Sequence, residues 1–434
     1  MSDTANARPT ANTLDIDELF TGGQEVRRCP YNHFEAIREH EGLYYSPVVE
    51  AYIVGREADV FEVLNKKDDF SYKAPFGLVA MRKESQAIKG LMAENSEMSE
   101  LMASLRPRRI PMLASCDPPA HTRQRKIAQA AFTPKRIAQL APRIQELADE
   151  LIDAFDTSGK VDFIKQFAIP LPVSVIATMM GVDRSQYRQF RKWSDDFFFA
   201  ASSGKTTPEQ LDEALHGQVD LFTYFAEQVE KRRANPREDL ITDIIFAHEA
   251  EGEEPLSLEE MQAMLGQLLV AGNESTGALL SSCLHYLARK PEVADVLRQR
   301  PEKIPNFVEE MIRLEAPSNS FFQYCVRDTT IGGVPIPAGS QVMLSYGAAG
   351  RDPAAHSDID FTADDNPRPS HISFGYGRHF CIGAPLARKE ANLAVETMLR
   401  RFSDIRLAEG ETPLFMTSYL ARGLSYLPLK LPPA

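Results

Sequence analysis

The pattern of apolar and polar positions predicts a chain that is helical over most of its length. From residue 122 to 315, apolar residues recur every three or four positions, the period of an amphipathic helix. Turn-forming groups such as Asn235-Pro236 divide this region into separate helices. The predicted helices span 122–130, 134–157, 172–180, 184–200, 207–233, 237–249, 257–289, 291–299 and 303–314, followed by one over 384–401.

The flanking regions predict small amounts of β-structure. Tyr31 to His40 is typical of a short helix, and Ala51 to Val54 of a strand. A hairpin is predicted over 331–339 and a strand over 342–345, while 412–432 is predicted as loop with short strands. The fold class is therefore mainly α with small β-sheets, that is, α+β.

Residues 74–115 lack a clean period, apart from an amphipathic piece over 89–105. This is long for a loop, and long loops in compact folds are often functional. Residues 1–25 are rich in Thr, Ala, Asn and Asp, which predicts a flexible N-terminal tail before a single domain over 26–434.

No segment of the sequence predicts a membrane anchor. The richest apolar stretch, Phe167 to Val182, contains Pro170 and Pro172 and falls short of the roughly 20 apolar residues that a membrane-spanning helix needs. The N-terminus lacks the basic-then-apolar layout of a signal peptide. We therefore expect a cytoplasmic protein.

Composition narrows the classes of partner. The 48 Lys and Arg against 61 Asp and Glu give a net charge of −13, which argues against nucleic acid because phosphate binding needs a basic surface. The five cysteines are too few and too scattered for a disulfide framework. A cysteine that does chemistry here acts alone.

The most informative stretch runs from Ser373 to Gly383, with the sequence SFGYGRHFCIG. Gly375 and Gly377 permit positive φ and a tight turn. Cys381 follows just before a predicted helix, where free N–H groups and the helix dipole favour an anion and lower a thiol pKa. Together these features predict a thiolate, held on a rigid loop, that faces a flat ligand.

The spacing Phe374-x-x-Gly-x-x-x-Cys381-x-Gly resembles the cytochrome P450 family, the haem-thiolate monooxygenases, and in particular its soluble bacterial members. The resemblance covers about residues 30 to 430. It implies the P450 fold with haem b (iron protoporphyrin IX) as cofactor and Cys381 as the thiolate ligand of the iron, with Phe374 and Gly375 beside the haem. Such a ligand favours O–O cleavage.

The predicted helix over 257–289 is about 45–50 Å long at 1.5 Å per residue, and its apolar positions predict that it crosses the core. Its middle, Ala271 to Thr276, departs from that pattern. Gly272 costs about 1 kcal/mol relative to alanine in a helix, and the polar residues cost more unless they are hydrogen-bonded. A local inconsistency of this kind is expected at a functional site.

The same stretch resembles the family pattern Ala-Gly-x-Glu/Asp-Thr-Thr, which implies a long central helix over the haem. By this resemblance Ala271 and Gly272 lie against the cofactor, while Glu274 and Ser275 manage water and protons at bound O₂. Ser275 stands where the family has its first threonine. It keeps the hydroxyl and loses the methyl that stiffens χ1, so we expect the relay to survive with more uncoupling of reduction from oxidation.

Contacts for the haem propionates are also implied by the resemblance. His121 and Arg125 lie four residues apart, on one helix face, in a stretch similar to the family's Asp-Pro-Pro-x-His-x-x-x-Arg. His379 matches another propionate contact. Gln323 stands where the family usually has a propionate-binding arginine, and the sequence leaves open whether Gln323 or Arg327 makes a contact.

Glu310 and Arg313 match the family's Glu-x-x-Arg helix motif, whose role is structural. The resemblance implies a buried ion network with a third arginine. Asp365 stands where that arginine is often found, and Arg368 is the alternative.

The resemblance also implies an electron donor and an apolar substrate. No flavin, nicotinamide or iron–sulfur motif is fused to the chain, so we expect a separate ferredoxin or flavodoxin, and a monomeric enzyme. The candidate basic surface for this donor is Arg123, Arg125, Lys126, Lys135 and Arg136. The candidate substrate-pocket residues are Leu268, Phe321, Phe322, Phe198 and Met416. Terpenoid, aromatic, steroid and macrolide substrates all fit.

The predicted activity is hydroxylation or epoxidation of a small apolar molecule with O₂. Two alternatives keep the haem, namely a peroxygenase and an isomerase, and the Glu274–Ser275 pair favours O₂ activation over both. A thiol enzyme that uses Cys381 as nucleophile and His379 as base lacks a third, orienting group. A helical binding scaffold leaves the Cys381 motif unexplained.

Overall fold

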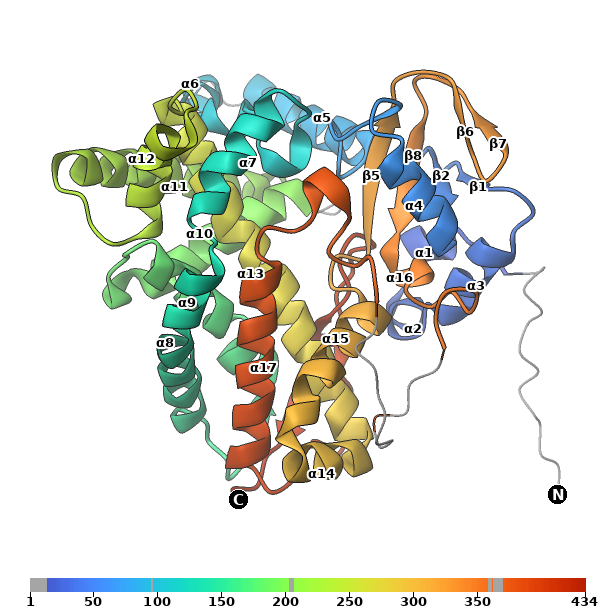
Figure 1. Cartoon of the computed structure of the whole chain (residues 1–434), viewed down its shortest axis with the longest axis vertical. Helices are drawn as coiled ribbons and strands as arrows, with labels where there is room; N and C mark the ends of the chain where they lie inside the picture. The colour runs from blue at the N-terminus through green and yellow to red at the C-terminus, as the bar shows by residue number, and fades with distance from the viewer. Residues whose placement is uncertain (1–13, 95–96, 203–206, 358–360, 362–369) are drawn as a thin grey trace.

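The computed structural model of the chain describes residues 14–94, 97–202, 207–357, 361 and 370–434. Most of these residues are helical (Figure 1). The N-terminal helices and the largest sheet lie on one side of the molecule, and helices α7 to α12 lie on the other. The class predicted from the sequence, mainly α with small sheets, is confirmed.

The helices follow the predicted order. The α-helices before residue 160 are α1 (Glu18–Thr21), α2 (Gln24–Arg28), α3 (Tyr31–Glu39), α4 (Glu57–Asn65), α5 (Leu78–Glu94), α6 (Glu97–Ser104), α7 (Ala120–Ala130) and α8 (Pro134–Asp153). The remaining α-helices are α9 (Pro170–Met179), α10 (Tyr187–Ser202), α11 (Pro208–Ala234), α12 (Leu240–Glu251), α13 (Leu258–Arg289), α14 (Pro291–Gln299), α15 (Ile304–Glu315), α16 (Tyr346–Ala349) and α17 (Ala384–Arg401). Short 3₁₀ or π turns span Pro107–Arg109, Leu113–Ser115, Ile164–Ala168, Arg184–Gln186, Pro301–Lys303 and Gly377–His379.

The strands form one larger sheet and three small ones. The five-stranded sheet has the order β1 (Tyr44–Ser46), β2 (Ala51–Val54), β8 (Gln341–Ser345), β5 (Ser320–Cys325) and β3 (Phe70–Ser71). Only the β2–β8 pairing in this sheet is parallel. The small sheets pair β4 (Val161–Asp162) and β9 (Arg406–Leu407) with β12 (Pro428–Lys430), β10 (Leu414–Phe415) with β11 (Leu424–Tyr426), and β6 (Thr329–Ile331) with β7 (Val334–Ile336).

Two predictions about the N-terminal region are wrong. The predicted tail over 1–25 falls partly outside the described residues, but its second half forms α1 and α2. Leu19 is buried there, and Arg27 donates a hydrogen bond to its carbonyl, so apolar anchoring orders the segment. The stretch 74–115, predicted to be mostly irregular, contains α5 and α6, because buried residues such as Met98 and Met102 pack against α11.

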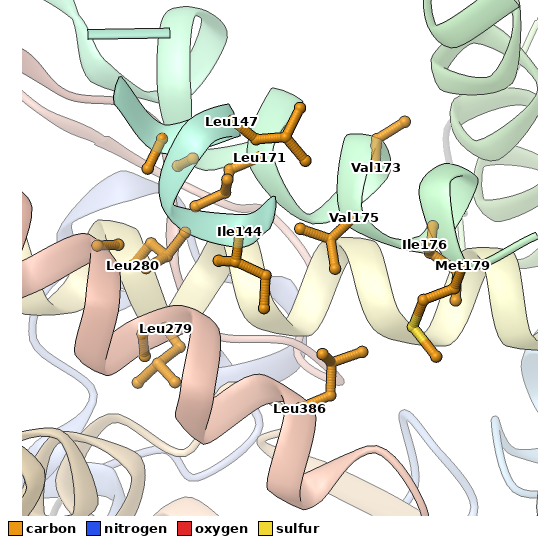
Figure 2. Close-up of a cluster of buried hydrophobic side chains, with 14 of the residues drawn as sticks. Ile144, Leu147, Leu171, Val173, Val175, Ile176, Met179, Leu279, Leu280 and Leu386 are labelled. Atoms are coloured by element: carbon orange, nitrogen blue, oxygen red, sulfur yellow. The ribbon is translucent and has the colours of Figure 1, made fainter. Parts of the chain in front are cut away.

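The core is built around α13, which runs through the helical half of the molecule behind α17 (Figure 1). The helix begins at a capping box in which Ser257 and Glu260 satisfy each other's backbone N–H groups. Figure 2 shows part of this cluster, to which α8 contributes Ile144, α9 contributes Val175 and α13 contributes Leu279. Leu280 is fully buried. The predicted crossing of the core by one long helix is confirmed.

Among the described residues, no helix combines the length and apolar character that crossing a membrane requires.

Candidate active site

The loop Ser373 to Gly383, called the cysteine loop here, has the backbone that its glycines predict. Gly375 and Gly377 adopt φ of 74° and 67°, in the left-handed region that favours glycine. The backbone N–H of Cys381 donates to the carbonyl of Phe374 across 2.8 Å, which closes the loop. Helix α17 begins at Ala384, so Cys381 lies three residues before the helix, as predicted.

The Cys381 side chain is exposed, yet protein atoms surround it closely enough that burial raises the pKa of its thiol. The backbone N–H groups of Gly383 and Ala384 and the charges of Arg125 and Arg388 lower this pKa, but they do not outweigh burial. The predicted net lowering of the thiol pKa is therefore wrong for the free side chain. Exposure combined with strong desolvation means that the sulfur lies in a recess.

Glu309 of α15 supports the cysteine loop through neighbouring residues. Sequence reasoning missed this residue. Glu309 accepts a hydrogen bond from Nε of Arg388 across 2.8 Å and another from Nε2 of His371 across 3.0 Å. The Arg388 guanidinium also lies 4.4 Å from the ring centroid of Phe374. A single buried carboxylate thus links α15, α17 and the segment just before the cysteine loop.

Glu310 and Arg313, the predicted ion pair, are both buried on α15. Nε of Arg313 donates to Oε2 of Glu310 across 2.7 Å, and its Nη1 donates to the carbonyl of Gly350. Asp365 and Arg368, the alternatives for a third member of this network, lie outside the described residues.

Three rings stack behind the cysteine loop. The centroids of Tyr72 and His379 lie 3.6 Å apart, and those of His379 and His121 lie 4.0 Å apart. Burial, followed by neighbouring positive charges, lowers the pKa of His379 to about 3 and that of His121 to about 4. Within the described part of the chain, the buried Nε2 of His379 has no hydrogen-bond partner. Both imidazoles are therefore neutral at pH 7.

The structure places the two alternatives, Gln323 and Arg327, in different surroundings. Gln323 is buried on β5 and forms a hydrogen bond with the hydroxyl of Tyr72. Arg327 is paired with Asp69 on the outside of the molecule. The structure thus brings Gln323, and not Arg327, to the stacked rings, together with Tyr72, which sequence reasoning missed.

Arg125 reaches the cysteine loop from α7. Its Nη1 donates to the carbonyl of Phe380, the residue before Cys381, across 2.7 Å. Burial lowers the pKa of the guanidinium, and the nearby Cys381 acts in the opposite direction. A cation one residue from the sulfur favours the thiolate form.

The polar middle of α13 is one continuous α-helix without a bulge. Ser275 Oγ donates to the carbonyl of Ala271 across 2.9 Å, the back-bonding that a serine inside a helix often makes. Ala271 is exposed on this core helix, and a Cβ on Gly272 would meet no atom within 4 Å. Thr276, by contrast, is buried. The helix therefore presents a bare surface to open space at Ala271 and Gly272.

Glu274 is half-buried, and its carboxyl has a strongly perturbed affinity for protons. Burial, and secondarily the charge of Asp195 on α10, raises the pKa of Glu274 to about 8. The side chain is therefore mostly protonated at neutral pH. Asp195 is another residue that the sequence did not single out.

The predicted pocket residues have mixed outcomes. Leu268 is buried on α13, and Phe321 is half-buried with its ring 6.3 Å from that of Phe76. Phe322 is 1% exposed and belongs to a different hydrophobic cluster, so the two neighbouring phenylalanines have different surroundings. The reason is strand geometry, because neighbouring residues of β5 point to opposite faces.

The structure gives less information about two further candidates for the substrate pocket. Phe198 belongs to α10, but its side chain lies outside the described part of the structure. Met416 lines a cavity of about 30 Å³, shared with residues such as Leu19 and Arg27 of the N-terminal helices. The structure therefore associates Met416 with the N-terminal region.

Most of the predicted basic surface is paired within the chain. Arg123 pairs with Glu260, and Arg136 with Asp243. Lys126 pairs with Glu253 across 2.6 Å. Lys135 is exposed. The patch is thus more neutral than its sequence indicates.

A family model described as Cytochrome P450 matches residues 83–423, a range that contains both α13 and the cysteine loop. Cytochrome P450 107B1 from Saccharopolyspora erythraea is 35% identical over 422 residues, covering 96% of this chain and 99% of that protein. Mycinamicin IV hydroxylase/epoxidase from Micromonospora griseorubida is 38% identical over 324 residues, covering 74% of this chain and 79% of that protein. The solved structure of cytochrome P450 CYP109Q5 from Chondromyces apiculatus has a TM-score of 0.80 at 31% identity, and the match covers 97% of this chain and 98% of that one.

Proposed function

Because the chain belongs to the cytochrome P450 family and is a haem-dependent monooxygenase, we propose that it hydroxylates or epoxidises a small apolar molecule. O₂ is the oxidant, and a separate ferredoxin or flavodoxin supplies the electrons. The observation that carries this proposal is the polar break in α13, where Glu274 and Ser275 interrupt an otherwise apolar core helix. The name of one relative, a hydroxylase/epoxidase, supports the reaction class.

The residues around Cys381 fit a haem. Cys381 is an exposed residue with a desolvated thiol, and α13 offers a bare surface at Ala271 and Gly272 that can accommodate a flat ring. The unpartnered Nε2 of His379 and the guanidinium of Arg125 suit carboxylates. We assign the iron to Cys381 and the propionates to His121, Arg125 and His379, with Tyr72 added to this group.

The bound haem supplies the iron chemistry that reduces O₂ and oxidises the substrate. The chain contributes charge control around it. The N–H groups of Gly383 and Ala384 and the cation of Arg125 stabilise negative charge on the Cys381 sulfur. The ion network of Glu309 with Arg388 and His371 keeps the cysteine loop rigid.

Proton handling falls to Glu274 and Ser275. A Glu274 side chain that is mostly protonated at neutral pH can donate a proton to the pocket. Because the Ser275 hydroxyl donates to the Ala271 carbonyl, its oxygen lone pairs remain able to accept a hydrogen bond from water in the pocket. This division gives a proton donor and an acceptor on adjacent residues.

The test has three steps. The absorption spectrum of the reduced, CO-treated protein should have the band of a thiolate-ligated haem, and its absence would contradict a haem role for Cys381. Oxidation should then depend on ferredoxin and O₂. Oxidation driven by peroxide alone would identify a peroxygenase, and a rearrangement without electrons an isomerase. Screening apolar compounds for a haem spin-state shift identifies the substrate class.

A further inference from the structure

Where α10 packs against α13, an acidic residue on each helix directly follows a residue that makes a hydrogen bond between the helices. The buried Nδ2 of Asn273 donates a hydrogen bond to Oγ of Ser194 across 2.9 Å. The next residue along each helix is a carboxylic acid, Glu274 on α13 and Asp195 on α10. The amide–hydroxyl bond thus places the two acidic residues next to the same contact between the helices.

The charged surroundings of the pair differ on its two sides. Within the described part of the chain, the charge that acts on Glu274 is that of Asp195. Asp195 itself is influenced by Arg191 and Lys192, one turn earlier on α10, and by Asp196. Glu274 is half-buried, whereas Asp195 is exposed and Lys192 beyond it is exposed as well. Asp195 is therefore the more solvent-exposed of the two acids.

We propose that Asp195 is the outer member of a two-carboxyl proton relay that reloads Glu274 from solvent. This inference rests on the proposed monooxygenase function. One proton leaves Glu274 for the pocket. The Asp195 carboxylate takes one proton from bulk water and passes it to the Glu274 carboxylate, so that both groups return to their starting states. No bond other than O–H bonds changes, and no electrons move.

Repulsion between two carboxylates makes such a relay efficient. The charge of Asp195 disfavours ionisation of Glu274 and so contributes to its raised pKa. Once Glu274 has lost its proton, the pair carries two negative charges in a partly desolvated place, which favours uptake of a new proton. Among the described residues no hydrogen bond joins the two carboxyls, so we route the transfer through a bridging water.

The test compares three variants. Asp195→Asn removes the outer acid and keeps its shape. Asp195→Glu restores an acid. Asp196→Asn is the matched control, because the neighbouring Asp196 pairs with Lys192 across 3.0 Å and packs against Gly217 of α11. All three should bind haem and give the same reduced CO spectrum as the unaltered protein.

The kinetic readout is ferredoxin-driven O₂ consumption by the haem-loaded enzyme, measured in H₂O and D₂O without any substrate. Asp195→Asn should lower the rate about tenfold and raise the solvent isotope effect, since positioned proton transfer contributes about 10²-fold or more. Asp195→Glu should recover most of the rate, and Asp196→Asn should retain it. An unchanged rate and isotope effect in Asp195→Asn would overturn the relay.

A second readout does not depend on turnover. Infrared titration of the protonated carboxyl band, assigned with Glu274→Gln, should give a midpoint near the pKa of about 8 in the unaltered protein. Asp195→Asn should move that midpoint down, and Asp196→Asn should leave it in place. An unmoved midpoint would refute the coupling of the carboxyls.

The two readouts also separate the relay from the proposed function. If the unaltered enzyme consumes no O₂ while the infrared midpoint shifts as expected, the proposed function fails and the carboxyl coupling stands.

Discussion

The ring of Tyr72 stacks on the imidazole of His379, with 3.6 Å between centroids and 19° between planes. The backbone N–H of Tyr72 also donates to Oδ1 of Asp117 across 3.1 Å. One tyrosine therefore joins the end of β3, the segment before α7, the cysteine loop and, through Gln323, strand β5. Four segments that are distant in sequence meet at this ring.

Tyr72→Phe should destabilise the protein by about 1–3 kcal/mol, because the buried Gln323 amide loses its acceptor while the ring stack remains. Tyr72→Leu should cost about 1 kcal/mol more through loss of the stack. Urea unfolding of the haem-loaded variants measures both changes. Equal destabilisation by the two substitutions would contradict a separate role for the stacked ring.

Cys381→Ser should abolish the absorption band of the reduced CO complex, since a serine hydroxyl is a far weaker iron ligand than a thiolate. The variant should fold, because the side chain is exposed and its backbone hydrogen bond to Phe374 is unaffected. Far-UV circular dichroism checks the fold, and the CO spectrum checks the ligand. A wild-type spectrum in Cys381→Ser would contradict the whole site.

Arg313→Ala should lower the free energy of unfolding by about 3–5 kcal/mol, because it leaves the carboxylate of Glu310 buried without its partner. Lys231→Ala provides the comparison, since Lys231 pairs with Glu227 on the exposed side of α11 and such pairs contribute less than about 1 kcal/mol. Denaturant titration of both variants measures the difference. A small effect of Arg313→Ala would mean that water reaches Glu310.

Glu390 on α17 should make stability fall with rising pH. Burial raises its pKa to about 8 from 4.5, and its Oε2 has no hydrogen-bond partner within the described residues. Between pH 4.5 and 8, the folded state holds a proton on Glu390 that the unfolded chain has already released. The free energy of unfolding therefore declines as the pH rises across that window.

Glu390→Gln should flatten this part of the pH profile and stabilise the protein most at pH 8 and above. Thermal unfolding at several pH values measures the effect. If the slope of stability against pH between pH 5 and 8 is the same in Glu390→Gln, other groups cause the pH dependence. Glu274 is such a group, because burial also raises its pKa to about 8.

Ser275→Thr should raise the fraction of electrons recovered in product, because the added methyl restricts χ1 of the hydroxyl. Ser275→Ala should lower that fraction severalfold, since it removes the hydroxyl that bonds to Ala271. Product formed per electron pair, measured with the substrate found by spectral screening, checks both. If Ser275→Ala forms as much product per electron pair as the unaltered protein, Ser275 takes no part in proton handling.

The helices with strong local signals could be predicted from sequence. The predicted range 384–401 coincides with α17, and 257–289 differs from α13 only by its N-cap, because a regular period and clear end signals are local properties. Helix α8 ends at Asp153 rather than at 157. Strand β5 was missed because its residues are buried or half-buried on both faces and show no alternation of apolar and polar residues.

The same distinction applies to the site. Cys381 lies in a single contiguous motif, so the sequence alone could identify it. Glu309, Tyr72 and Asp195 come from segments far from the residues they serve, and no local pattern marks them. Only the fold shows that Glu309 supports the cysteine loop or that the charge of Asp195 acts on Glu274.

The internal pairing of Arg123, Lys126 and Arg136 has a consequence for electron delivery. Cations that are already neutralised by acids of the same chain exert little long-range attraction on an acidic donor. We therefore expect the association rate of the donor to lie near the unsteered value of about 10⁵–10⁶ M⁻¹s⁻¹ and to change little with ionic strength.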